Sequence, residues 1–217
     1  MDTRIEQLRN SSGEADTHGL SNELVDSFLK IDPNLNIALD LAIKARENLD
    51  DEVEDLLVSL NESQFARELQ KDFVNFYEPS TVNPYIPLAA KGPWIITTHG
   101  AVVHDNGGYG MLGMGHDPTE VMSSMSKSHV MANVMTPSVT HKRFADTLKR
   151  EVGHTRGACP FDRFICMSSG SESVTVAMRI SDINARLMTD QEGPHQGKEI
   201  WTVALDSGFH GRTDRPA

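Results

Sequence analysis

The sequence has little cysteine, few aromatic residues and no long hydrophobic run. Its 217 residues include only Cys159 and Cys166. Two cysteines seven positions apart form neither a disulfide framework nor a zinc-binding motif. So low a cysteine content is typical of proteins in the reducing cytosol. No stretch reaches the roughly 18 apolar residues that a membrane span needs, and the first residues lack the apolar core of a signal peptide. We therefore expect a cytoplasmic protein without a membrane partner.

The chain also lacks an excess of basic charge. Its formal net charge is −11, and residues 1–80 alone carry 18 acidic and 7 basic residues, whereas residues 81–217 carry 13 of each. An acidic surface repels nucleic-acid phosphates and anionic lipids, so we expect neither as a partner. The uneven distribution of charge predicts regions with different roles.

Residues 1–80 are predicted to form an acidic, helical N-terminal extension. The polar residues 1–19 are predicted to be frayed. Asp32, which a proline follows, is a favourable N-cap for the helix after it. Asn61 and Gln64 have the spacing of a capping box at the start of another helix.

Residues 81–118 are predicted to form an N-terminal strand and a glycine-rich segment. Prolines before and at the start of this region break the helical pattern. Two β-like runs, 94–98 and 101–105, are separated by only two residues, which predicts a tight hairpin. The glycine-rich segment follows at 107–115.

Residues 119–217 have the pattern of an α/β layer. We expect a helix that begins at Ser138, a buried strand at 161–167, a helix at 171–188 and a second strand at 199–205. A helix between two strands favours a parallel sheet with helices packed on it.

The turn after the first of these strands has the composition of a phosphate site. Residues 168–172 read SSGSE, and the N-terminus of a helix offers N–H donors and a favourable dipole to an anion. Gly170 allows close approach of the backbone, and Ser169 and Ser171 can add hydroxyl donors. The alternative interpretation is a plain helix cap.

The loop after the second strand offers complementary groups. Residues 208–213 read GFHGRT. Phe209 can stack on an aromatic ligand, His210 can stack or hydrogen-bond beside it, and Arg212 can bind a carboxylate. Both loops would leave the same edge of a parallel sheet, where ligands bind in open α/β folds. The alternatives are a core position for Phe209 and a surface ion pair for Arg212.

The two motifs, which begin 40 residues apart, resemble the cofactor pocket of the class III aminotransferases, which use pyridoxal 5′-phosphate (PLP). The resemblance extends from about residue 85 to 217 and includes the segments 107–110 and 115–118. It implies part of the large domain of the fold type I PLP enzymes, preceded by a small β-hairpin and the helical extension. By the same resemblance, the turn 168–172 would hold the cofactor phosphate, Phe209 would stack on the ring, and Arg212 would contact the substrate carboxylate.

The implied activity is transfer of an amino group between an amino acid or amine and a 2-oxo acid, in a homodimer. No lysine follows Lys198, and the resemblance puts the Schiff-base lysine and the aspartate at the pyridine nitrogen beyond Ala217. We therefore assign no catalytic residue and expect this chain alone to be inactive.

Ser173 and Thr175 stand where the family usually has alanine and glutamate. This departure bears on which substrate the enzyme would use. An aminomutase, a decarboxylase, or a non-catalytic binding or regulatory protein built on a degenerate half-domain are the alternatives.

Three histidines, His99, His104 and His116, invite a metal interpretation. No cysteine or glutamate completes a ligand set around them. The sequence therefore predicts no metal site.

Overall fold

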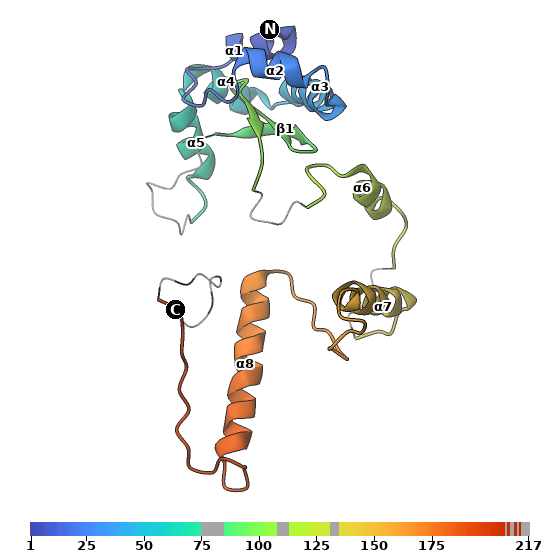
Figure 1. Cartoon of the computed structure of the whole chain (residues 1–217). Coiled ribbons are helices and arrows are strands. Elements are labelled where there is room, and N and C mark those ends of the chain that lie inside the picture. The colour runs from blue at the N-terminus through green and yellow to red at the C-terminus, as the bar shows by residue number, and fades with distance from the viewer. Residues whose placement is uncertain are drawn as a thin grey trace. The chain divides into compact units, whose positions relative to one another are not determined.

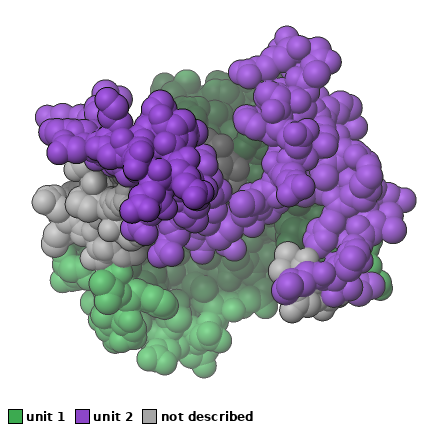
Figure 2. Space-filling view, turned by 90° about the horizontal axis from the view of Figure 1, so that it is seen from below, with its two compact units in different colours: residues 1–129 green, residues 130–217 purple. Residues whose placement is uncertain are grey.

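The computed structural model describes residues 1–74, 85–107, 113–130, 135–206, 208, 211 and 213. The chain divides into two compact units, Met1–His129 and Val130–Ala217 (Figures 1 and 2). Each unit is described by itself. Among the described helices, none combines the length and apolarity that a bilayer crossing requires.

The first unit consists of short helices around a small sheet. Its helices are α1 (Thr3–Asn10), α2 (Asn22–Phe28), α3 (Pro33–Glu47), α4 (Asp51–Ser59), α5 (Glu62–Gln70) and α6 (Thr119–Met125). Its strands are β1 (Pro87–Lys91), β2 (Trp94–Thr97) and β3 (Val102–His104). The strand order is β1-β2-β3, and both neighbouring pairs are antiparallel.

Local caps fix where several of these helices begin. Asp32 directly precedes Pro33, the first residue of α3. Its carboxylate accepts a hydrogen bond from the backbone N–H of Asn34 at 2.9 Å. Asn61 and Gln64 form the predicted capping box at the start of α5. These side chains satisfy N–H groups that the first turn of a helix leaves without partners, so both predicted starts are confirmed.

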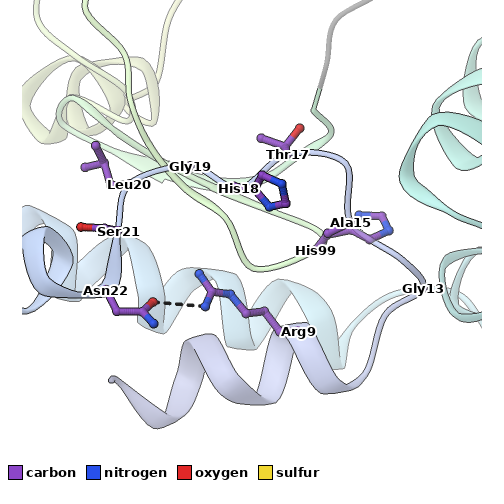
Figure 3. Close-up of a pocket in the computed structure, with 10 residues that line it drawn as sticks. All are labelled: Arg9, Gly13, Ala15, Thr17, His18, Gly19, Leu20, Ser21, Asn22 and His99. Atoms are coloured by element: carbon purple, nitrogen blue, oxygen red, sulfur yellow. Dashed lines mark hydrogen bonds between the residues drawn. The ribbon is translucent and has the colours of Figure 1, made fainter.

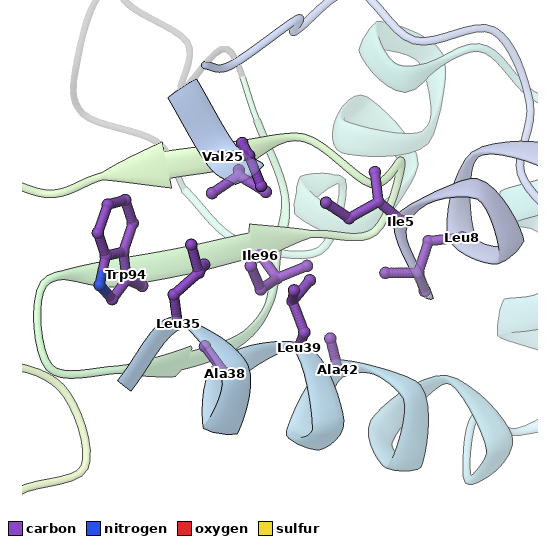
Figure 4. Close-up of a cluster of buried hydrophobic side chains, with 10 residues drawn as sticks. Ile5, Leu8, Val25, Leu35, Ala38, Leu39, Ala42, Trp94 and Ile96 are labelled. Carbon is purple, nitrogen blue, oxygen red and sulfur yellow. The ribbon is translucent and has the colours of Figure 1, made fainter. Parts of the chain in front are cut away.

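The core of the first unit lies between the helices and the sheet. Helix α3 packs on β1 and β2, and its Leu35 and Leu39 are buried with Trp94 and Ile96 (Figure 4). Burying a large apolar side chain contributes about 1.5–3 kcal/mol. The acidic helices and the strands therefore share one core.

The prediction that residues 1–19 are frayed is wrong. Ile5 and Leu8 are 1% and 0% exposed, and they join the same core from α1 (Figure 4). Their spacing of three puts both on one face of the helix. Hydrogen bonds from Arg4 to the carbonyl oxygen of Asn36 and to Asp40 also hold α1 against α3.

The predicted hairpin is confirmed as β2 and β3. Trp94 is opposite His104, and Ile96 is opposite Val102. Gly100 has a φ of 72° in the connecting turn, a conformation that favours glycine. Strand β1, which pairs with β2 through Ala90 and Ile95, was not anticipated, because the prolines around it suggested only a break.

The second unit contains α7 (Val139–Gly153) and α8 (Gly170–Thr189). Ser138 caps α7 as predicted, with its hydroxyl accepting from the N–H of His141. The mixed α and β composition of the chain agrees with the predicted class. The predicted parallel sheet is not formed by the described residues, whose sheet is antiparallel and belongs to the first unit.

The predicted strands at 161–167 and 199–205 are not strands in the structure. A strand needs a hydrogen-bonded neighbour, and neither segment has one among the described residues. Their apolar side chains are correspondingly exposed, with Ile165 at 65% and Val203 at 91%. The apolar pattern was real, but it does not by itself supply a partner strand.

Candidate functional site

The turn before α8 is a complete capping box. The Ser169 hydroxyl accepts a hydrogen bond from the N–H of Glu172 at 3.2 Å. Glu172 Oε2 accepts in return from the N–H groups of Ser168 and Ser169, at 2.9 and 3.0 Å. The sequence SSGSE thus has a structural role as a helix cap, and Ser169, predicted to bind the cofactor, serves first as that cap.

Gly170 and Ser171 occupy the first two positions of α8. N–H groups at these positions have no acceptor within the helix. A Cβ placed on Gly170 would meet no atom within 4 Å, so the fold does not require glycine there. The space on the Cβ side of Gly170 is therefore open.

Within the described residues, Gly211 of the loop that carries the second motif approaches this turn closely. A Cβ placed on Gly211 would lie 2.4 Å from the Ser171 hydroxyl oxygen and 3.0 Å from Ser171 Cα. Gly211 also has a φ of 98°. Both the close approach and the backbone conformation require glycine at this position. Segments about 40 residues apart in sequence are therefore in contact here.

Three of the predicted site residues, Phe209, His210 and Arg212, lie outside the described residues. Their predicted roles in stacking and in carboxylate binding stay predictions. The structure does bring together Ser169, Gly170 and Ser171, which form the turn, with Gly211, which the sequence analysis had not singled out. The second glycine of the sequence GFHGRT, at residues 208–213, was the feature from which a close approach at Gly211 could have been predicted.

The turn is exposed to solvent. At an exposed helix N-terminus an anion gains only about 0.3–1 kcal/mol from the dipole. The Glu172 carboxylate lies at the same turn and would repel a second anion. A phosphate would therefore need further donors, and the adjoining loop is the segment in contact that could provide them.

The three histidines that invited a metal interpretation, His99, His104 and His116, have separate surroundings. His116 Nε2 is 3.1 Å from Asp105 Oδ2, and His104 Nδ1 is 2.7 Å from Asn106 Oδ1. Within the described ranges no three metal-ligating side chains come together. His99 is buried and lines a pocket, which the sequence analysis missed because the other walls come from residues predicted to be frayed.

Comparison with known proteins identifies no relative of the chain. No protein-family model, curated protein or solved structure matches the chain.

Proposed function

We propose that the chain is part of a PLP-dependent aminotransferase of class III, which transfers an amino group between an amino acid or amine and a 2-oxo acid. The observation that carries the proposal is the contact of Gly211 with Ser171. It supports a shared site for the turn 168–172 and the loop 208–213. The finer fold, that of the fold type I PLP enzymes, is part of the same proposal, as is a homodimer.

In this proposal the chain's own residues bind and orient the cofactor. The N–H groups of Gly170 and Ser171 donate to its phosphate, with the Ser171 hydroxyl beside them. Phe209 packs against the face of the ring, and His210 lies beside it. Arg212 binds the substrate carboxylate. When bound, PLP supplies the electron sink that the reaction requires, and we assign no residue of this chain to the covalent steps.

The described residues fit a phosphate in part. The open space at Gly170 allows an anion to approach the backbone. Glu172 counts against tight binding, because its carboxylate already accepts hydrogen bonds from the N–H groups of Ser168 and Ser169. The turn thus offers a small number of donors, and affinity would depend on the neighbouring loop.

The test uses pyridoxine 5′-phosphate and pyridoxine, which lack the aldehyde and so cannot react with surface lysines. Isothermal titration of the chain should show binding of the phosphorylated compound and at least tenfold weaker binding of pyridoxine. Gly170→Asp places a carboxylate where acids suit a helix start, so α8 should persist while phosphate binding is lost.

Gly113→Asp is the matched control, because Gly113 also has open space at its Cβ. It adds the same charge at a residue that belongs to neither the turn 168–172 nor the loop 208–213, and it should leave binding unchanged. Equal binding of both compounds, or an unaltered affinity in Gly170→Asp, would contradict the proposal.

A further inference from the structure

A pocket of about 610 Å³ lies in the first unit. Its walls are α1, the loop from Gly13 to Asn22, and His99 in the turn between β2 and β3. In Figure 3 this loop runs around the pocket, and Arg9 points from α1 into the space that the loop encloses. The volume is within the range of about 300–1,000 Å³ that is common for small-molecule sites.

The walls carry positive charge and hydrogen-bond donors. Among the described residues that line the pocket there is no aspartate or glutamate, and Arg9 provides a permanent positive charge. His18, Ser21 and Asn22 add polar groups. The lining therefore carries the positive charge of Arg9, while Glu62 and Asp16, which do not line the pocket, lie close enough to His99 to act on its pKa.

Arg9 is held in place with donors to spare. Its Nε donates to the carbonyl of Gly100 at 3.2 Å, and its Nη1 donates to Asn22 Oδ1 at 3.2 Å. Within the described part of the chain, Nη2 has no acceptor. A guanidinium that is fixed on one side and open on the other suits a carboxylate or phosphate.

His99 adds a buried group that lacks a partner. Its side chain is 1% exposed, and Nδ1 shares a hydrogen bond with the Thr98 hydroxyl at 3.0 Å. Nε2 is buried and has no hydrogen-bond partner among the described residues. A buried polar atom without a partner costs about 1–3 kcal/mol, and Glu62 Oε1 is likewise buried without a hydrogen-bond partner among the described residues.

The loop around the pocket is anchored from outside. Glu62 is 1% exposed, and its Oε2 accepts from the N–H groups of Asp16 and Thr17 at 2.9 and 2.7 Å. At the other end of the loop, the N–H of Leu20 donates to the carbonyl of Val102 at 2.9 Å. These bonds shape the wall before any ligand arrives, which reduces the entropy lost on binding.

From these observations we infer that the pocket binds a small organic anion through its carboxylate or phosphate group. Arg9 pairs with the anionic group, and His99 forms part of the wall. The site is separate from the one proposed for PLP, since all its residues belong to the first unit.

The experiment follows backbone amide NMR signals of the full chain during titration with inorganic phosphate or with acetate. Chloride keeps the ionic strength constant. Saturable shifts of the Thr17 and Gly19 signals are expected, and the anion with the larger affinity identifies the preferred group. Shifts that chloride reproduces, or no saturable shift with either anion, would overturn the inference.

Two variants make the assignment specific. Arg9→Gln should weaken binding about tenfold or more, because it removes the charged donor. His18→Glu keeps Arg9 and its bonds but adds a negative charge to the wall, and it should abolish binding. Arg143→Gln, on the exposed side of α7, is the control and should bind as the unaltered chain does. Unchanged affinity in His18→Glu, with the core signals of Ile96 and Val102 intact, would refute the site even if Arg9→Gln unfolds.

Discussion

Asp32 shows how one side chain can join a helix to the sheet. One of its carboxylate oxygens caps α3, and the other accepts from Trp94 Nε1 at 2.8 Å. Burial raises the pKa of Asp32, but the hydrogen bonds from Trp94 and Asn34 outweigh burial and leave the pKa below its usual value. Trp94 is 1% exposed, so its indole N–H depends on this partner.

Replacing Asp32 should therefore cost more than a helix cap. Asp32→Ala removes the cap, worth about 1 kcal/mol, and leaves a buried N–H unpaired, at about 1–3 kcal/mol. We expect the free energy of unfolding to fall by about 2–4 kcal/mol in urea, followed by Trp94 fluorescence in a Trp201→Phe background. Asp50, at the N-cap of α4, makes no side-chain cap bond. Asp50→Ala should have almost no effect, and equal losses in the two variants would contradict this account.

His99 makes stability depend on pH. Burial lowers the pKa of its imidazole, with Glu62 and Asp16 opposing that effect and Arg46 adding to it. As pH falls below about 6.5, the ordinary value for histidine, the unfolded chain takes up the proton before the folded chain does. The free energy of unfolding should thus decrease from pH 7 towards the lower pKa of folded His99.

His99→Gln removes this titration. The difference in unfolding free energy between the unaltered chain and the variant, measured from pH 8 to 5, should change with pH in favour of the variant on the acidic side. A difference that is constant over this range would show that His99 does not titrate between the two states.

At the scale of elements, short-range sequence patterns predicted where helices begin, but they did not predict which strands pair with each other. Ser138 and Asn61 mark helix starts because a cap and its N–H partner are three residues apart. The hairpin of β2 and β3 was found for the same reason. The segments 161–167 and 199–205 have the apolar composition of strands, but composition does not say which backbone lies beside them.

The same difference in range separates the two candidate sites. The cap at Ser169 and Glu172 could be read from five consecutive letters. The pocket around His99 could not, because its walls come from residues about 80–90 positions earlier and depend on the folding of α1. Ile5 and Leu8, three residues apart, were the available signal.

Gly170, at the start of α8, and Gly211, in the loop that contacts Ser171, should respond oppositely to replacement by alanine. Gly170→Ala should stabilise the helix by about 0.5–1 kcal/mol, because its Cβ meets no atom and glycine is entropically costly in a helix. Gly211→Ala should loosen the loop, since its Cβ would collide with Ser171 and its φ is 98°. Hydrogen exchange in the first turn of α8 should slow in the first variant and accelerate in the second. The same change in both would contradict the contact.

At the scale of the whole molecule, the two units differ in what they bury. The first has a core with fully buried side chains, whereas α8 in the second has no buried residue. Ile180, Ile183 and Leu187 form a stripe on α8, with exposed fractions of 49%, 60% and 65%. Apolar patches of this kind mark surfaces that bind another surface or that aggregate.

We therefore expect the chain to associate with itself and to bind a hydrophobic dye. Light scattering coupled to size exclusion should give a mass above 24.0 kDa that rises with concentration. The double variant Ile183→Lys and Leu187→Lys should lower the apparent mass and the dye signal. Ile31→Lys is the control, because Ile31 is 74% exposed and belongs to the first unit, not to the stripe on α8. A monomer without dye binding at all concentrations would contradict the expectation.

The bond between Leu20 and Val102 has a consequence for how the sheet meets other chains. Val102 belongs to β3, an outer strand, and edge strands tend to recruit foreign strands and so seed fibrils. Gly19 lies so close to this rim that a Cβ on it would be 2.5 Å from the Val102 carbonyl oxygen. The N-terminal loop thus covers the edge of the sheet at β3 and hinders the pairing of a strand from another chain with it.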